Sequence, residues 1–155
     1  MRSCTRTLTA LWIAAVVVLS CAALVTAKGS PRMDPVAGGG ETWAISPYEF
    51  AGGGQIIIRD QQYEFSAYTV VMDIRPGDDG TLHVRTSHTF RFGEYMIVTD
   101  DEAVADPTDT PGLYVLNSNM QVITGGRGRL HAHGFIDLLA GHTSFELRGA
   151  VNLDD

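Results

Sequence analysis

The chain has 155 residues, of which 45% are hydrophobic and 19% charged, so it is long enough for one domain with a core and too apolar for a disordered acidic tail. Its 18 acidic residues outnumber its 11 lysines and arginines, which gives a formal net charge of −7. A surface of that sign repels nucleic acid and anionic lipid, so we expect no nucleic-acid partner. Only Lys28 is a lysine, and this bias towards arginine fits a GC-rich, bacterial source.

The N-terminus has the parts of a secretory signal peptide. Arg2 and Arg6 make it positive, residues 10–25 are apolar, and Ala27 ends a segment that a signal peptidase accepts. We therefore expect residues 1–27 to be a signal peptide and the mature protein to be secreted or periplasmic. Two alternatives stay open: an uncleaved N-terminal segment that anchors the protein in the membrane, and lipid attachment at Cys21. Without either of them, we expect no contact with a membrane.

Cleavage would change both the charge and the cysteine content of the protein. Residues 1–27 hold Arg2 and Arg6 but no acidic residue, so the mature chain has nine basic and 18 acidic residues and a net charge of −9. They also hold Cys4 and Cys21, which are all the cysteines of the chain. The mature domain is thus expected to be free of disulfides and held together by core packing alone.

Residues 28–42 are expected to form a flexible linker, because they contain Pro31, Pro35 and the run Gly38-Gly39-Gly40 and few side chains that could pack. The folded domain is then expected to span residues 43–155. Within it, no stretch keeps apolar residues at helical spacing without an interruption by glycine, proline or a β-branched residue. The pattern predicts strands over residues 55–59, 63–74, 81–92, 94–99, 113–124, 130–139 and 143–153.

The segment 81–92 alternates most clearly. One face carries Leu82, Val84, Thr86, His88, Phe90 and Phe92. A period of two places one face in the core and the other in water, so these six side chains are predicted to point into the interior and to line any ligand cavity there.

The acidic segment 100–112 contains Pro107 and Pro111 and is expected to be a long surface loop, and the glycines of residues 125–128 are expected to form a turn.

Seven or eight antiparallel strands joined by short turns leave two edges that must be protected. Closure into a barrel removes both edges, so we predict an all-β, eight-stranded antiparallel barrel. A two-sheet sandwich is the alternative, because the strand count does not separate the two architectures.

Two segments carry a resemblance to a known superfamily. Val122-Ile123-Thr124-Gly125-Gly126-Arg127-Gly128-Arg129, followed by Phe145-Glu146-Leu147-Arg148-Gly149, resembles the closing strands of allene oxide cyclase and dirigent-like barrels. With residues 86–93 and 110–114, these segments look like uncharacterised secreted bacterial proteins of that type, over residues 52–153. The resemblance implies an eight-stranded barrel with a modest central cavity, and no motif lets a catalytic residue be carried over.

A few polar side chains could take part in acid–base catalysis or metal binding. His88 lies on the apolar face between Thr86 and Phe90, where a buried imidazole can act as an acid or base; the more common role is a hydrogen-bonded core histidine. His131 and His133 share a strand face with Asp137, a set that can bind zinc. The more common arrangement leaves such histidines in water, and a third ligand such as His83 would be needed.

No nucleophile or phosphate-binding motif is found, and no cofactor is expected. We predict a non-enzymatic barrel that binds a small apolar ligand or serves as a structural module. One alternative is a cyclase-like or dirigent-like enzyme that uses His88, and a second is a metal-binding extracytoplasmic protein that uses His131 and His133. A solidly packed lumen would exclude both ligand binding and catalysis, whereas an open lumen with His88 and a carboxylate would favour the enzyme. The sequence leaves the ligand and the oligomeric state open.

Overall fold

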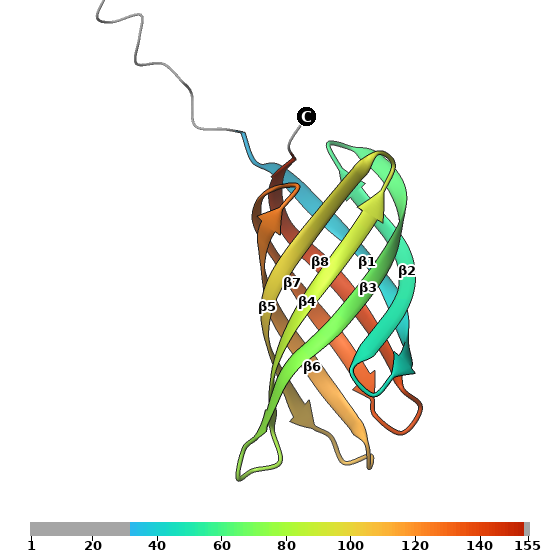
Figure 1. The fold of residues 1–155 in the computed structure, drawn as a ribbon, viewed down its shortest axis with the longest axis vertical. Coiled ribbons are helices and arrows are strands. Elements are labelled where there is room, and N and C mark those ends of the chain that lie inside the picture. The colour runs from blue at the N-terminus through green and yellow to red at the C-terminus, as the bar shows by residue number, and fades with distance from the viewer. Residues whose placement is uncertain (1–31, 154–155) are drawn as a thin grey trace, which may run out of the picture. The chain divides into compact units, whose positions relative to one another are not determined.

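The structure is a computed structural model that describes residues 32–153, and these residues form a closed antiparallel barrel of eight strands (Figure 1). The strands are β1 (Asp34–Ser46), β2 (Glu49–Ile58), β3 (Gln61–Pro76), β4 (Leu82–Phe92), β5 (Tyr95–Pro107), β6 (Leu113–Thr124), β7 (Gly126–Asp137) and β8 (His142–Leu153). Each strand pairs with the next, and β8 pairs with β1, so the sheet has no edge. The predicted eight-stranded barrel is confirmed, and the sandwich is excluded.

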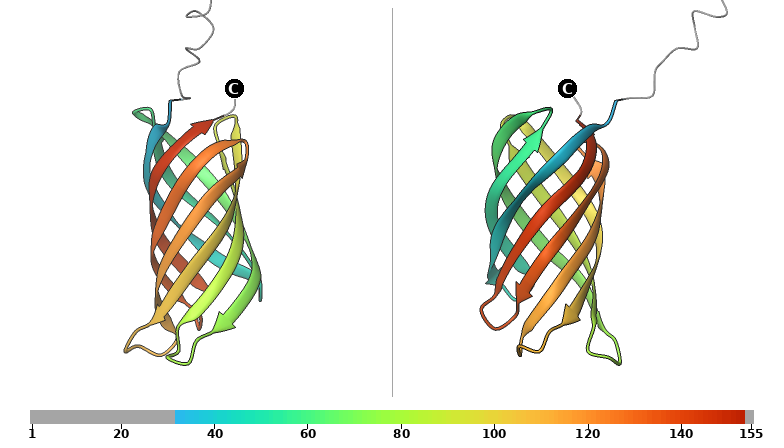
Figure 2. Two further views of the ribbon diagram at one scale, coloured as in Figure 1. Left: turned by 90° about the vertical axis from the view of Figure 1, so that its left-hand side faces the viewer. Right: turned by 180° about the vertical axis from the view of Figure 1, so that it is seen from behind.

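The two ends of the barrel differ in what they carry. The start of β1, the end of β8 and the β2–β3, β4–β5 and β6–β7 turns lie at one end, called here the terminal end (Figures 1 and 2). The other four turns lie at the opposite end, called here the distal end. The predicted signal peptide, residues 1–27, lies outside the described residues.

The expected linker over residues 28–42 is wrong from Asp34 onward, because β1 begins there. Its glycines are paired on both sides, as Gly40 is with Gly54 of β2 and Phe145 of β8. A Cβ atom at Gly40 would lie 2.9 Å from Cζ of Phe65, so the glycine leaves the space that this ring fills. Residues 28–31 lie outside the described part of the chain.

The expected surface loop over residues 100–112 is also largely wrong. Strand β5 continues to Pro107, and its buried residues alternate with more exposed ones. Thr99, Asp101, Ala103 and Ala105 are buried on the inner face, whereas the carboxylates of Asp100 and Glu102 lie on the outer face. The acidic residues at the outer positions made this segment resemble a surface loop, although its buried and exposed residues alternate with the period of two of a regular strand.

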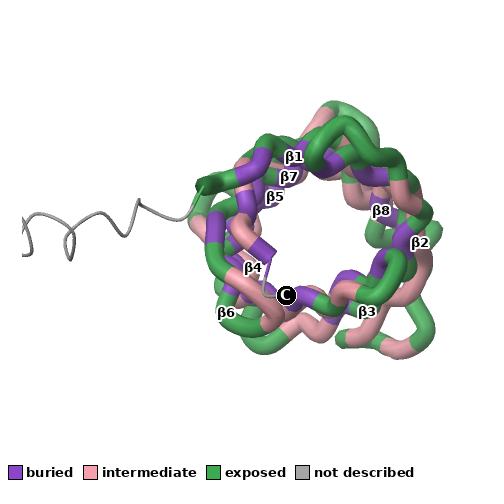
Figure 3. Tube along the Cα trace, turned by 90° about the horizontal axis from the view of Figure 1, so that it is seen from above, coloured by how far each residue is buried: buried purple, intermediate pink, exposed green. Residues whose placement is uncertain are grey.

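The hydrophobic core fills the terminal half of the barrel, and Figure 3 shows buried positions alternating with exposed ones around the wall. Aromatic rings form its centre: Phe65 and Phe90 pack edge to face with centroids 5.6 Å apart, and Tyr63 packs on Phe92 at 5.7 Å. Full burial of a side chain such as Phe90 contributes roughly 1.5–3 kcal/mol. This end of the lumen is therefore closed by packed side chains.

Candidate functional site

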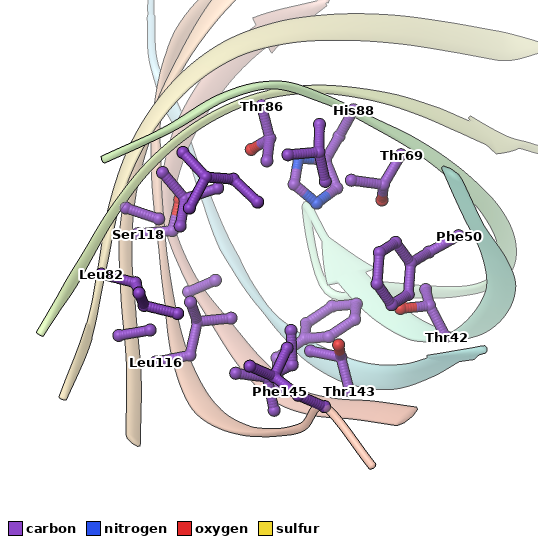
Figure 4. A pocket seen from close by; sticks show the side chains of 18 of the residues that line it. Thr42, Phe50, Thr69, Leu82, Thr86, His88, Leu116, Ser118, Thr143 and Phe145 are labelled. Carbon is purple, nitrogen blue, oxygen red and sulfur yellow. The ribbon is translucent and has the colours of Figure 1, made fainter. Parts of the chain in front are cut away.

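The distal half of the lumen holds a cavity of about 130 Å³ (Figure 4). Most of its wall is apolar: Pro47, Phe50, Val71, Ile74, Leu82, Val84, Ala103, Ala105, Leu116, Met120, Ala132, Ile136, Leu138 and Phe145. Ile74 and Leu138 are also exposed, so the cavity meets solvent at the distal end, which we call the mouth. An apolar cavity of about 150 Å³ is known to hold benzene, so this volume suits a molecule near the size of one aromatic ring.

The predicted inner face of β4 runs through both halves of the lumen. Leu82, Val84, Thr86 and His88 line the cavity. Phe90 and Phe92 do not; each is 1% exposed and belongs to the packed core, so including them among the cavity residues was wrong. The physical reason is that rings from the neighbouring strand β3, such as Phe65, pack against these two residues and fill the lumen there.

Six polar side chains from five strands face the cavity between its apolar walls, and we call them the polar ring. They are Thr42 of β1, Thr69 of β3, Thr86 and His88 of β4, Ser118 of β6 and Thr143 of β8 (Figure 4). All five hydroxyl-bearing residues are buried. On β3 and β4 these positions lie between the aromatic core and the aliphatic residues of the mouth. The cavity can therefore surround an apolar body and hydrogen-bond one polar group.

His88 is held in a fixed orientation by three contacts. Its Nδ1 contacts Oδ2 of Asp101, a carboxylate that is 0% exposed. Thr86 Oγ1 donates to the same Oδ2 at 3.2 Å. The imidazole stacks on Phe90 with an interplanar angle of 7° and centroids 5.6 Å apart. Asp101 lies behind His88 and is not itself among the lining residues of the cavity.

Several buried polar atoms of this region lack a hydrogen-bond partner within residues 32–153. They are the hydroxyl oxygens of Thr69, Thr99 and Ser118 and Oδ1 of Asp101. A buried polar atom left unpaired costs about 1–3 kcal/mol, so each of these atoms calls for a partner such as a water, an ion or a ligand. Thr69 and Ser118 both line the cavity, so two of these oxygens face the space that a ligand would fill.

Sequence reasoning found His88 and Thr86 but missed the rest of the polar ring and Asp101. The hydroxyl residues belong to separate strands, and their convergence depends on the closed register of the barrel. Asp101 had a local signal, since Asp101, Ala103 and Ala105 repeat at a spacing of two, but the neighbouring acidic residues concealed it.

The candidate metal ligands of β7, which are His131, His133 and Asp137, lie on the outer face and form hydrogen bonds with other groups. His131 and His133 pair through Nδ1 with the side-chain oxygens of Asn119 and Asn117, at 3.3 and 2.9 Å. The Asp137 carboxylate accepts the backbone N–H groups of Leu139 and Ala140 in the β7–β8 turn. Within residues 32–153 no group of three or more His, Cys, Asp or Glu side chains is arranged to hold a metal ion.

Large apolar side chains are exposed around the mouth. They come from the ends of β1 and β3 and from the two adjoining turns: Trp43, Ile45, Tyr48, Met72, Ile74, Leu138 and Leu139. An apolar molecule would meet this surface before it entered the cavity.

No helix among the described residues is long and apolar enough to cross a membrane.

Comparison of the chain with models of protein families, with curated proteins and with solved structures gave no significant match.

Proposed function

We propose that this protein binds one small, largely apolar molecule in the distal half of its barrel. The observation that carries the proposal is the form of the lumen, which is closed by aromatic packing at one end and reaches solvent at the other. Its walls are apolar, and a few polar groups from five strands face it, which is the usual composition of a small-molecule site. The N-terminal segment supports a role outside the cytoplasm.

The size of the cavity sets the expected affinity. Burying an aromatic ring removes roughly 150–250 Å² from water, which at about 25 cal/mol per Å² contributes roughly 4–6 kcal/mol. This corresponds to a dissociation constant of roughly 0.05–1 mM before any hydrogen bond is counted. Binding should therefore be measured by calorimetry or by NMR shifts at high ligand concentration.

Filling the lumen should abolish binding without disturbing the barrel. Ala105 is 2% exposed and lines the cavity, whereas Val104 is its outward-facing neighbour on β5. The probe ligand is 4-ethylphenol, a small aromatic molecule with one hydroxyl group. We expect Ala105→Phe to weaken its binding at least tenfold, because the new ring occupies the space of the ligand. The control, Val104→Phe, should bind as the unchanged protein does.

Both variants should keep the circular dichroism spectrum and cooperative thermal unfolding of the unchanged protein. Undiminished binding by folded Ala105→Phe would show that the ligand lies outside the lumen.

The contact between His88 and Asp101 favours a second candidate, a cyclase-like or dirigent-like enzyme that acts on the bound molecule. An imidazole held by a carboxylate can donate or accept a proton at a ligand's polar group. Ligands that bind can be recovered after long incubation and examined by mass spectrometry and NMR. A binding protein returns them unchanged, whereas conversion that is lost in His88→Phe would establish the enzyme.

A further inference from the structure

The contacts of His88 determine which hydrogen-bonding role its second ring nitrogen presents to the lumen. Nδ1 faces Oδ2 of Asp101, which also accepts the hydroxyl proton of Thr86. Because this oxygen accepts from Thr86, we infer that it accepts from the imidazole as well, which places the proton between them on Nδ1 of His88. In a neutral imidazole with its proton on Nδ1, Nε2 is an acceptor.

The remaining polar ring supplies hydroxyl groups that can donate. Thr69 pairs directly with His88 across β3 and β4, so both side chains lie on the inner face at the same level. The Thr69 hydroxyl is buried and has no partner among the described residues. A bound hydroxyl group could donate its proton to Nε2 of His88 and accept the proton of Thr69 at the same time.

Other polar groups fit this arrangement less well. A carbonyl or ether oxygen only accepts, so it would face the lone pair of Nε2 without a proton between them. A carboxylate needs a cation to offset its burial, yet none of the described residues that line the cavity is lysine or arginine.

We propose that the polar group received by the ring is a hydroxyl, so that the ligands are small phenols and alcohols with apolar bodies. This inference rests on the proposed function, because it names the ligand class of the same lumen. It goes further in assigning the roles within the site: His88 Nε2 accepts, and Thr69 Oγ1 donates.

Three probes of nearly equal size test the inference at pH 8.5. They are 4-ethylphenol, which donates and accepts, 4-ethylbenzaldehyde, which only accepts, and 4-ethyltoluene, which does neither. We expect 4-ethylphenol to bind about tenfold more tightly than either of the others, because only it satisfies both His88 and Thr69.

The variant His88→Phe should lose this preference, so that 4-ethylphenol binds no better than 4-ethyltoluene. His83 lies on the outer face of the same strand, and the control His83→Phe should keep the full preference. If His88→Phe fails to fold, a measurement on the unchanged protein decides the question: long-range ¹H–¹⁵N NMR correlations should show the proton of His88 on Nδ1.

The possible outcomes separate this inference from the proposed function. Equal binding of the three probes, tighter binding of the aldehyde, or a proton on Nε2 would overturn the assignment of a hydroxyl ligand while leaving a ligand-binding lumen in place. If none of the three probes binds, the proposed function and the inference both fail.

Discussion

Two adjacent aspartates on β5 show how strongly the face of a strand decides the role of a side chain. Asp100 lies on the outer face, where Arg85 donates to it from Nε at 3.1 Å and from Nη2 at 2.7 Å. Asp101 lies on the inner face, out of contact with solvent, between Thr86 and His88. The first carboxylate joins two strands at the surface, and the second orients the imidazole of the candidate site.

The ion pair between Arg85 and Asp100 should contribute to the way the stability of the protein depends on pH. The hydrogen bonds from Arg85 are the main cause that lowers the pKa of Asp100 below its ordinary value of 3.8. A lowered pKa in the folded state means that Asp100 contributes stability above pH 3.8, and this contribution is lost as the pH falls through the lowered pKa. In Arg85→Met, an NMR titration of the carboxyl carbon should show the pKa of Asp100 returning towards 3.8.

Arg91 is the matched control, since it lies on the same outer face of β4 and pairs with Met96 in the register. In Arg91→Met the pKa of Asp100 should stay low. A low pKa that persists in Arg85→Met would assign the effect to another group.

The polar ring should cost stability where its hydroxyls are unpaired. Thr69→Val removes a buried hydroxyl that has no partner among the described residues, so the ligand-free variant should gain about 1 kcal/mol in the free energy of unfolding. Thr86→Val is the opposite case, because it removes a donor to buried Asp101 and should lose about 1–3 kcal/mol. Urea denaturation measures both, and equal losses in the two variants would contradict the assignment of Thr69 to a ligand.

At the scale of residues, the sequence predicted the strand face on which a single side chain lies better than it predicted which side chains of different strands come together. His88 and Thr86 were placed on an inner face from the alternation of one strand, which needs no knowledge of the neighbours. Asp101, Thr69 and Ser118 join them only through the register of β3 to β6, and a single sequence does not contain that register.

At the scale of elements, the predicted strands 55–59, 63–74, 81–92, 113–124 and 143–153 match strands of the barrel, except that Arg59 and Thr81 lie just outside β2 and β4. Strand β1 was missed because its centre is glycine, which normally weakens a strand; here Gly40 makes room for Phe65. The expected turn over residues 125–128 was also too long. Gly126 and Gly128 are paired residues of β7, and Gly125 alone joins β6 to β7.

Two turn glycines with similar backbone angles should respond differently to alanine. Gly125 has φ of +77° and Gly80 has φ of +85°, so both substitutions introduce roughly 1–2 kcal/mol of left-handed strain. A Cβ at Gly125 would also lie 1.8 Å from the Met96 carbonyl oxygen, whereas the nearest atom to a Cβ at Gly80 is 3.6 Å away.

We therefore expect Gly80→Ala to lose about 1–2 kcal/mol in the free energy of unfolding and Gly125→Ala to lose clearly more. Chemical denaturation of the two variants gives the comparison. Equal losses would show that the β6–β7 connection relaxes without cost.

For the whole molecule, stability and the candidate function lie in different halves of one barrel. Aromatic side chains of β3 and β4 pack across the terminal half, whereas small residues such as Ala105 and Ala132 leave the distal half hollow. The barrel itself could be predicted because a meander of strands must protect its edges. Which half is hollow could not, since the free volume at each level depends on side chains from all eight strands together.

The location of a bound ligand tests the central claim most directly. Crystals of the protein soaked with 4-bromophenol would show the bromine through its anomalous scattering. We predict bromine density inside the distal half of the barrel, with the phenol hydroxyl within hydrogen-bonding distance of His88 Nε2. Bromine found only on the outer surface, with a lumen closed by side chains, would contradict a binding site inside the barrel.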